Sequence, residues 1–177
     1  MGKHIHTRIF FMVLAIILFF ALGAGLTFSA SSAKYVQYAA ARDGEAIISM
    51  VEEIAENMEA ESAGEWTEKP EENQREKSKY ILQKSKERMK EGPFYGKLLV
   101  FNSKYGQVYP EVFQDGELPD RLTQSCQKIL KEGNGVYPET IEVGNEKWHL
   151  NYFVMDTDYL VRAKYFIAAV PVPDLGV

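Results

Sequence analysis

The chain has 177 residues, of which 46% are hydrophobic, and a formal net charge of -5. This length favours about one folded domain. A single cysteine excludes an internal disulfide framework and a zinc site built from cysteines alone. The acidic excess argues against the basic surface that binds phosphates, so we expect no nucleic-acid partner.

An uncharged apolar run, IFFMVLAIILFFALGAGLTF, occupies residues 9–28. A helix of this length spans roughly 30 Å, the thickness of the hydrocarbon core of a bilayer. Lys3 and Arg8 precede the run, and basic flanks stay in the cytoplasm. We therefore expect residues 1–8 to be cytoplasmic, residues 9–28 to cross the cell membrane and the rest to be extracytoplasmic. A cleaved signal peptide is the alternative, but its apolar region is ordinarily only about 7–15 residues long.

Two helices are predicted before the chain turns to strands. Residues 34–58 carry an apolar stripe at helical spacing, which either the following domain or a second copy of the helix must cover. Gly44 interrupts this helix at a cost of about 1 kcal/mol relative to alanine. After a polar loop, residues 75–91 form a lysine-rich second helix that ends at Gly92 and Pro93. The apolar stripe of the first helix, residues 34–58, consists of Val36, Ala40, Ile47, Val51, Ile54 and Met58.

The remaining pattern is mainly that of strands, over residues 97–102, 107–109, 140–143, 147–155 and 159–170. Residues 103–106 form the first turn, and Gly144-Asn145 is a tight-turn signal. A short helix starts around Pro119 and closes at Gly133. Strands at hairpin spacing predict an antiparallel sheet whose face the early helices cover, so the fold class is α+β.

The order of these elements resembles a known family. The expected elements follow one another in this order: a membrane span, a long helix, the segment LLVFNSKYGQVYP, a short helix, and the segments VGNEKWHLNYFVM and YLVRAKYFIAAVPVP. In this order they resemble the Cache (PAS-like, PDC-type) sensor domain of bacterial transmembrane receptors, most often sensor histidine kinases. The resemblance covers about residues 30–174 and implies a PAS-like central antiparallel sheet of about five strands, flanked by helices.

The resemblance implies the input region of a two-component sensor histidine kinase. Such a region works as a homodimer, binds a small extracellular ligand and transmits a helix shift across the membrane. A chemoreceptor or a cyclic-dinucleotide receptor can use the same input domain, and a single-pass anchored surface protein with no transmitter is the alternative from another class. The 177 residues contain no second span, histidine box or ATP-binding pattern, so we expect a transmitter to lie beyond Val177.

Strand alternation separates the candidate ligand-binding residues. Trp148 and Tyr152 share one face of their strand, and His149 takes the other; Arg162 and Lys164 point away from the apolar face of the last strand. One interpretation is a small anionic ligand held by Arg162, Lys164 and His149, with Trp148 or Tyr152 as an aromatic wall. The alternative is that the aromatics are core and the cations are solvated. The resemblance adds Tyr109, Arg121 and Tyr137 to the candidates.

The sequence contains no catalytic motif of the GxSxG, HExxH, P-loop or CxxC type. We therefore expect no catalytic residue, cofactor or metal centre in this chain. Residues 52–76 hold ten acidic side chains. They form either a solvated loop or a surface that binds divalent cations near anionic lipid.

Overall fold

The computed structural model describes residues 2–61, 70–104, 106–111, 120–157 and 162–174. It divides into two compact units, one of residues 1–38 with 175–177 and one of residues 39–174. Helix α1 (Gly2–Glu61) supplies residues to both units. The predicted span at 9–28 and the predicted helix at 34–58 are parts of this one helix.

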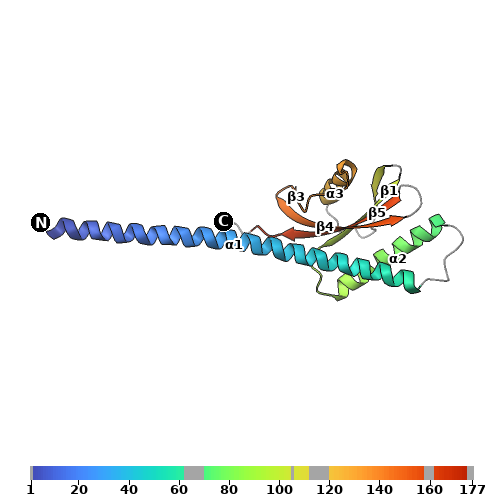
Figure 1. The fold of residues 1–177 in the computed structure, drawn as a ribbon, viewed down its shortest axis with the longest axis horizontal. Coiled ribbons are helices and arrows are strands. Elements are labelled where there is room, and N and C mark those ends of the chain that lie inside the picture. Colours follow the sequence, from blue (N-terminus) through green and yellow to red (C-terminus); the bar gives the residue numbers. More distant parts are fainter. Residues whose placement is uncertain (1, 62–69, 105, 112–119, 158–161, 175–177) are drawn as a thin grey trace. The chain divides into compact units, whose positions relative to one another are not determined.

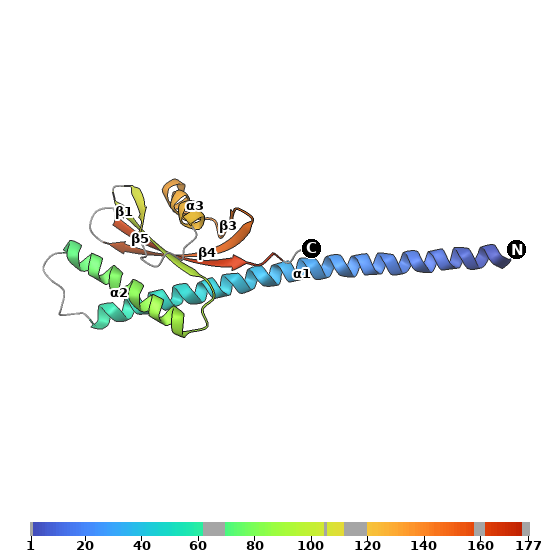
Figure 2. The same cartoon turned by 180° about the vertical axis from the view of Figure 1, so that it is seen from behind.

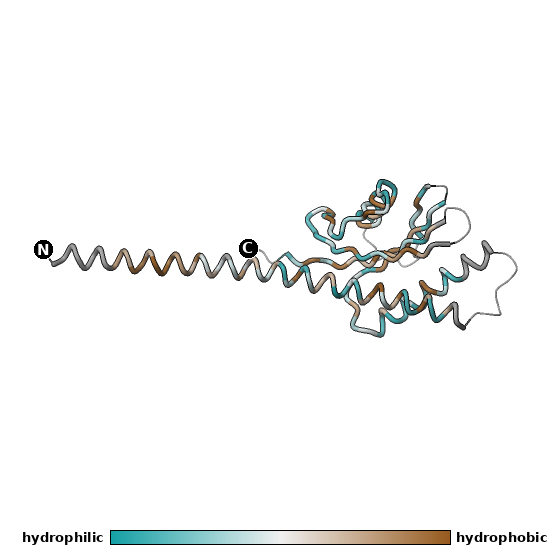
Figure 3. Tube along the Cα trace, in the orientation of Figure 1, coloured by the Kyte–Doolittle hydropathy of each residue, from teal (hydrophilic) through white to brown (hydrophobic). Residues whose placement is uncertain are grey.

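The first unit consists of the apolar part of α1. This part is long and apolar enough to cross a membrane. Between Phe10 and Phe28 the described large apolar side chains are exposed, from 40% for Leu14 to 76% for Phe19. Figure 3 shows a hydrophobic stretch in this part of the helix. Exposed apolar side chains on every side of a helix are compatible with a lipid environment.

The second unit is α+β, as predicted, and contains a five-stranded antiparallel sheet of order β2-β1-β5-β4-β3. Helices α1 and α2 cover one face of the sheet, and α3 lies on the other (Figures 1 and 2). The elements after α1 are α2 (Pro70–Glu91), β1 (Lys97–Lys104), β2 (Gln107–Pro110), α3 (Asp120–Glu132), β3 (Thr140–Val143), β4 (Glu146–Thr157) and β5 (Arg162–Val172).

The core below the sheet is built on the apolar stripe of α1. Ile47 and Val51 are fully buried and belong to the same cluster as Phe166 and Val170 of β5 and Ile81 of α2. Of the two alternatives left open by the sequence, the domain of the same chain covers this stripe. The stripe as a whole is therefore not a free surface for a second copy of the helix.

Gly44 has a packing role that its helix propensity does not indicate. It is buried, and a Cβ at this position would collide with the side-chain amide of Asn151 in β4. The glycine leaves room for the Asn151 side chain between α1 and the sheet, although it costs roughly 1 kcal/mol in a helix interior relative to alanine.

Several predicted strand boundaries differ from the structure by one or two residues, and two of these differences have a clear physical reason. Ser103, expected in a turn, lies in β1 opposite Val108, and its Oγ accepts a hydrogen bond of 2.7 Å from the backbone N–H of Ala163. Pro171, expected to end the last strand, lies within β5 opposite Trp148. The β1 partners of β5 stop at Ala169, so one side of β5 is unpaired at Pro171 and a missing N–H is tolerated there.

Candidate functional site

The sheet separates the predicted site residues onto two faces. Trp148 and Tyr152 belong to the cluster beneath α3. Phe153, the residue after Tyr152 in β4, packs against the cluster that contains α1 and α2. By the same alternation His149 and Lys164 lie on the α1 and α2 face. The predicted grouping of cations with an aromatic wall is therefore not assembled, because the backbone of the sheet stands between them.

The cationic candidates are also separated along their own face. His149 pairs with Val170, and Lys164 pairs with Met155. Six residues of β4 separate these two positions, which corresponds to about 20 Å. One small ligand cannot contact both side chains.

Lys164 already has an anionic partner. Its Nζ lies 2.5 Å from Oε1 of Glu111, and the two side chains are only 12% and 19% exposed. Glu111 follows β2, and its own N–H donates to the carbonyl of Val100 at 2.8 Å. The position at which a ligand carboxylate was predicted is occupied by a carboxylate of the same chain.

His149 is half-buried, and burial lowers its pKa, while the negative charge of Glu139 acts in the opposite direction. The ring is therefore mostly neutral at neutral pH, which is unfavourable for holding an anion. Tyr109 is 48% exposed at the edge strand β2 and donates a hydrogen bond to the side-chain oxygen of Gln107. Arg162 begins β5 opposite Thr157, but its side chain lies outside the described residues.

The α3 face carries a group of three tyrosines, Tyr137, Tyr152 and Tyr165, which we call the tyrosine cluster. The rings of Tyr137 and Tyr152 stack with centroids 4.9 Å apart, and Tyr165 meets Tyr137 edge-on at 6.3 Å. Tyr152 donates a hydrogen bond of 3.0 Å to the carbonyl of Pro138. Two of the three, Tyr137 and Tyr152, were predicted as ligand-binding residues, and Tyr165 was not.

Burial raises the pKa of both Tyr137 and Tyr152, and the neighbouring Tyr165 raises that of Tyr137 further. Both phenols therefore stay protonated at physiological pH. The single hydroxyl proton of Tyr152 is already donated to the carbonyl of Pro138, so toward any further partner this hydroxyl can only accept. Cys126 of α3 is fully buried, and burial raises its pKa to about 12. A thiol in this state is not a nucleophile, so the cluster offers stacking and hydrogen bonding but no covalent chemistry.

The other two candidates near α3 differ in exposure. Trp148 is buried, only 6% exposed, and no hydrogen-bond partner is found for its Nε1. Arg121 at the start of α3 is exposed and extends over the β3–β4 turn, with its Nη1 3.7 Å from where a Cβ on Gly144 would stand. The structure therefore brings Trp148, Tyr152 and Tyr137 to one face together with α3, and leaves Arg121 at its rim.

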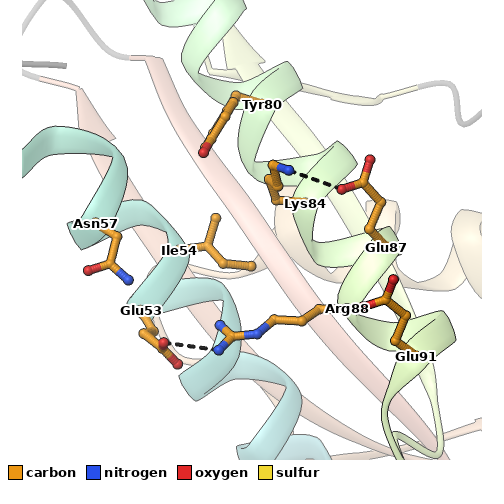
Figure 4. Close-up of a pocket in the computed structure, with 8 residues that line it drawn as sticks. All are labelled: Glu53, Ile54, Asn57, Tyr80, Lys84, Glu87, Arg88 and Glu91. Atoms are coloured by element: carbon orange, nitrogen blue, oxygen red, sulfur yellow. Dashed lines mark hydrogen bonds and ion pairs between the residues drawn. The ribbon is translucent and has the colours of Figure 1, made fainter. Parts of the chain in front are cut away.

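A polar groove of about 470 Å³ lies on the opposite side of the second unit, between α1 and α2. Figure 4 shows Arg88 of α2 reaching across to Glu53 of α1, at 3.1 Å, and Lys84 paired with Glu87 on α2 itself, at 3.2 Å. Within the described residues no three acidic, histidine or cysteine side chains are placed to hold a metal ion. The structure does not describe most side chains of the acidic stretch at 52–76, so a cation site there stays a prediction.

Comparison of the chain with models of known protein families, with curated proteins and with solved structures gave no match.

Proposed function

We propose that this chain is the extracytoplasmic signal-sensing input region of a membrane-bound two-component sensor histidine kinase, anchored by α1 and acting as a homodimer. The observation that supports the proposal most is the double use of α1. One part of the helix is apolar and exposed, as a membrane span is, and the next part forms the core under the sheet. The assignment to a kinase and the homodimer in this proposal come from the family resemblance.

The tyrosine cluster is the proposed place of ligand contact. The resemblance implies a pocket formed by the last strands and the short helix before them, and Tyr137, Tyr152 and Tyr165 lie on that face. Stacked aromatic rings that carry neutral hydroxyl groups suit a small molecule with a planar group. Arg121 at the rim can pair with an acidic substituent of the ligand.

The link from this face to the membrane is β5. Tyr165, Ile167 and Ala169 of β5 belong to the cluster under α3, while Phe166, Ala168 and Val170 belong to the cluster that contains α1. Any ligand-driven rearrangement of β5 therefore changes the surface on which α1 packs. Such signalling requires that the ligand bind one of two packing states more tightly than the other.

The site is tested by thermal unfolding of the full chain in lipid nanodiscs during a screen of small metabolites. We expect compounds that raise the melting temperature of the parent protein to have no effect on Tyr137→Ala. Tyr95→Ala is the matched control, since Tyr95 is 60% exposed and takes part in none of the ring contacts found among the described residues. Stabilisation that survives unchanged in Tyr137→Ala would show that the ligand binds elsewhere.

The alternatives are a chemoreceptor, a cyclic-dinucleotide receptor or an anchored surface protein. The coding sequence after Val177 distinguishes them. A second apolar run of about 20 residues followed by a histidine box supports the kinase. A stop codon there supports the surface protein. Alkaline phosphatase is active only after export, so a fusion of it after Val177 that shows no activity would contradict the extracytoplasmic assignment itself.

A further inference from the structure

Two tyrosines follow the apolar part of α1 along the helix. Tyr35 is 73% exposed and Tyr38 is 70% exposed, and Lys34 beside them is also exposed. Seven residues, close to two helical turns, separate Tyr35 from Phe28, so the two side chains lie on the same side of α1. Along this side the helix changes from a purely apolar ring to rings that carry a hydroxyl group.

The spacing places these rings near the edge of the hydrocarbon core. The Cα atom of Tyr35 lies about 10 Å along the axis from that of Phe28. Side chains in a helix lean toward its amino end, so the Tyr35 ring covers the preceding turn, roughly 5 Å closer to Phe28. The headgroup layer on each side of the hydrocarbon core is about 5–8 Å thick, so the ring of Tyr35 falls within it. The ring of Tyr38, three residues further along α1, lies roughly 10 Å from Phe28 and therefore on the aqueous side of this layer.

We propose that Tyr35 and Lys34 form a belt that lies among the phospholipid headgroups on the extracytoplasmic side, with Tyr38 at its aqueous side. This inference rests on the proposed anchoring by α1. Amphipathic aromatic rings favour the headgroup level, where one end meets hydrocarbon and the other meets water. The ammonium group of Lys34 can pair with lipid phosphate, and no acidic side chain occurs in α1 between residue 9 and Lys34 to compete for it.

The belt restricts how α1 can move. Sliding the helix along the membrane normal would carry the Tyr35 ring either into hydrocarbon or into water. Rotation about the helix axis leaves the rings at the same depth, whereas tilting moves rings that lie off the axis up or down. The belt therefore favours rotation over a piston movement for the helix shift proposed above.

Depth-dependent fluorescence quenching tests the belt. The full chain is placed in vesicles of phosphatidylcholine and phosphatidylglycerol, brominated either near the headgroup end or near the far end of the acyl chain. We compare Tyr35→Trp with Phe19→Trp in the middle of the apolar run and with Tyr95→Trp in the second unit, each as a difference from the parent protein. We expect shallow bromine to quench Tyr35→Trp more strongly, deep bromine to quench Phe19→Trp more strongly, and neither to quench Tyr95→Trp.

The possible failures are distinguishable. If Phe19→Trp is quenched but Tyr35→Trp is not, the anchor stands and the belt is wrong; burial of Tyr35 against a second copy would give this result. If deep bromine quenches Tyr35→Trp as strongly as it quenches Phe19→Trp, Tyr35 lies in hydrocarbon and the belt is also wrong. If Phe19→Trp is not quenched, the anchoring itself is wrong.

Discussion

The two parts of α1 are both rich in apolar residues, yet the structure treats them in opposite ways. Between Phe10 and Phe28 the described large apolar side chains are exposed. Between Ala40 and Met58 the apolar side chains form a stripe that is buried against the sheet and α2, and the charged ones lie outside it. What separates a candidate membrane span from a core helix is therefore the distribution of apolar residues around the helix, more than their number.

The largest expected effect comes from a charge placed in the buried part. Ile47 is fully buried, so Ile47→Asp leaves a carboxylate among apolar side chains. We expect the second unit to lose about 3–5 kcal/mol of unfolding free energy, the range for an uncompensated buried charge. Chemical denaturation followed by circular dichroism measures this loss. A loss below about 1 kcal/mol would mean that Ile47 is not core.

The reciprocal change belongs in the exposed part. Ile17 is 58% exposed, so Ile17→Asp should leave the melting of the second unit unchanged. It should instead weaken membrane insertion by about 2.5–3.5 kcal/mol, the cost of aspartate at the centre of a spanning helix. Extraction from membranes at alkaline pH provides the measurement. Equal retention of Ile17→Asp and the parent protein would contradict the lipid environment proposed for this part.

Alanine substitutions at two glycines, one in each part of α1, should have smaller effects on stability that also differ between the two parts. A Cβ at Gly44 would collide with the Asn151 amide, whereas one at Gly23 meets nothing within 4 Å. We expect Gly44→Ala to destabilise the second unit by about 1 kcal/mol, because overpacking of about 1–3 kcal/mol exceeds the gain of about 1 kcal/mol in helix propensity.

The effect of Gly44→Ala on the stability of the second unit should change sign when the Asn151 amide is removed. In an Asn151→Ala background, Gly44→Ala should stabilise the second unit by about 0.5–1 kcal/mol, the propensity gain alone. Gly23→Ala should leave the melting of the second unit unchanged in either background. A double-mutant cycle with no coupling between positions 44 and 151 would refute the close contact.

The smallest effect concerns pH. Burial lowers the pKa of His149 in the folded state, so below about pH 6.5 the unfolded chain binds more protons there than the folded one. The contribution of His149 is therefore fully present above that pH and is lost as the pH falls through the lowered pKa of the folded state. His149→Gln should flatten this part of the stability curve. A parent curve and a variant curve that stay parallel below about pH 6.5 would show that His149 is not perturbed.

Much of the fold follows from local patterns. Periodicity identified α1, α2, α3 and the five strands, because amphipathic spacing reports directly which side chains are buried. The failures at Ser103 and Pro171 depend on the sheet. Whether a serine or a proline is tolerated in a strand depends on which neighbouring strand is present at that position, and strand order is not encoded locally.

The candidate site was less predictable for the same reason. Alternation correctly placed Trp148 and His149 on opposite faces, and this already shows that they cannot line one pocket. The pairing of Lys164 with Glu111 joins residues 53 positions apart, and only the register of the assembled sheet reveals it. Tyr165 joins Tyr137 because the connection after α3 returns over β4 and β5, which no spacing in the sequence indicates.

The position of β5 has a consequence for how the second unit is made. β5 is the last strand in sequence, but it lies at the centre of the sheet, between β1 and β4. The two hairpins on either side can form early, yet each exposes an unpaired edge until β5 arrives. Folding must therefore wait until nearly the whole unit has been synthesised, and the non-local pairings that complete it make this step slow. Until then the emerging chain exposes unpaired strand edges, which favour aggregation.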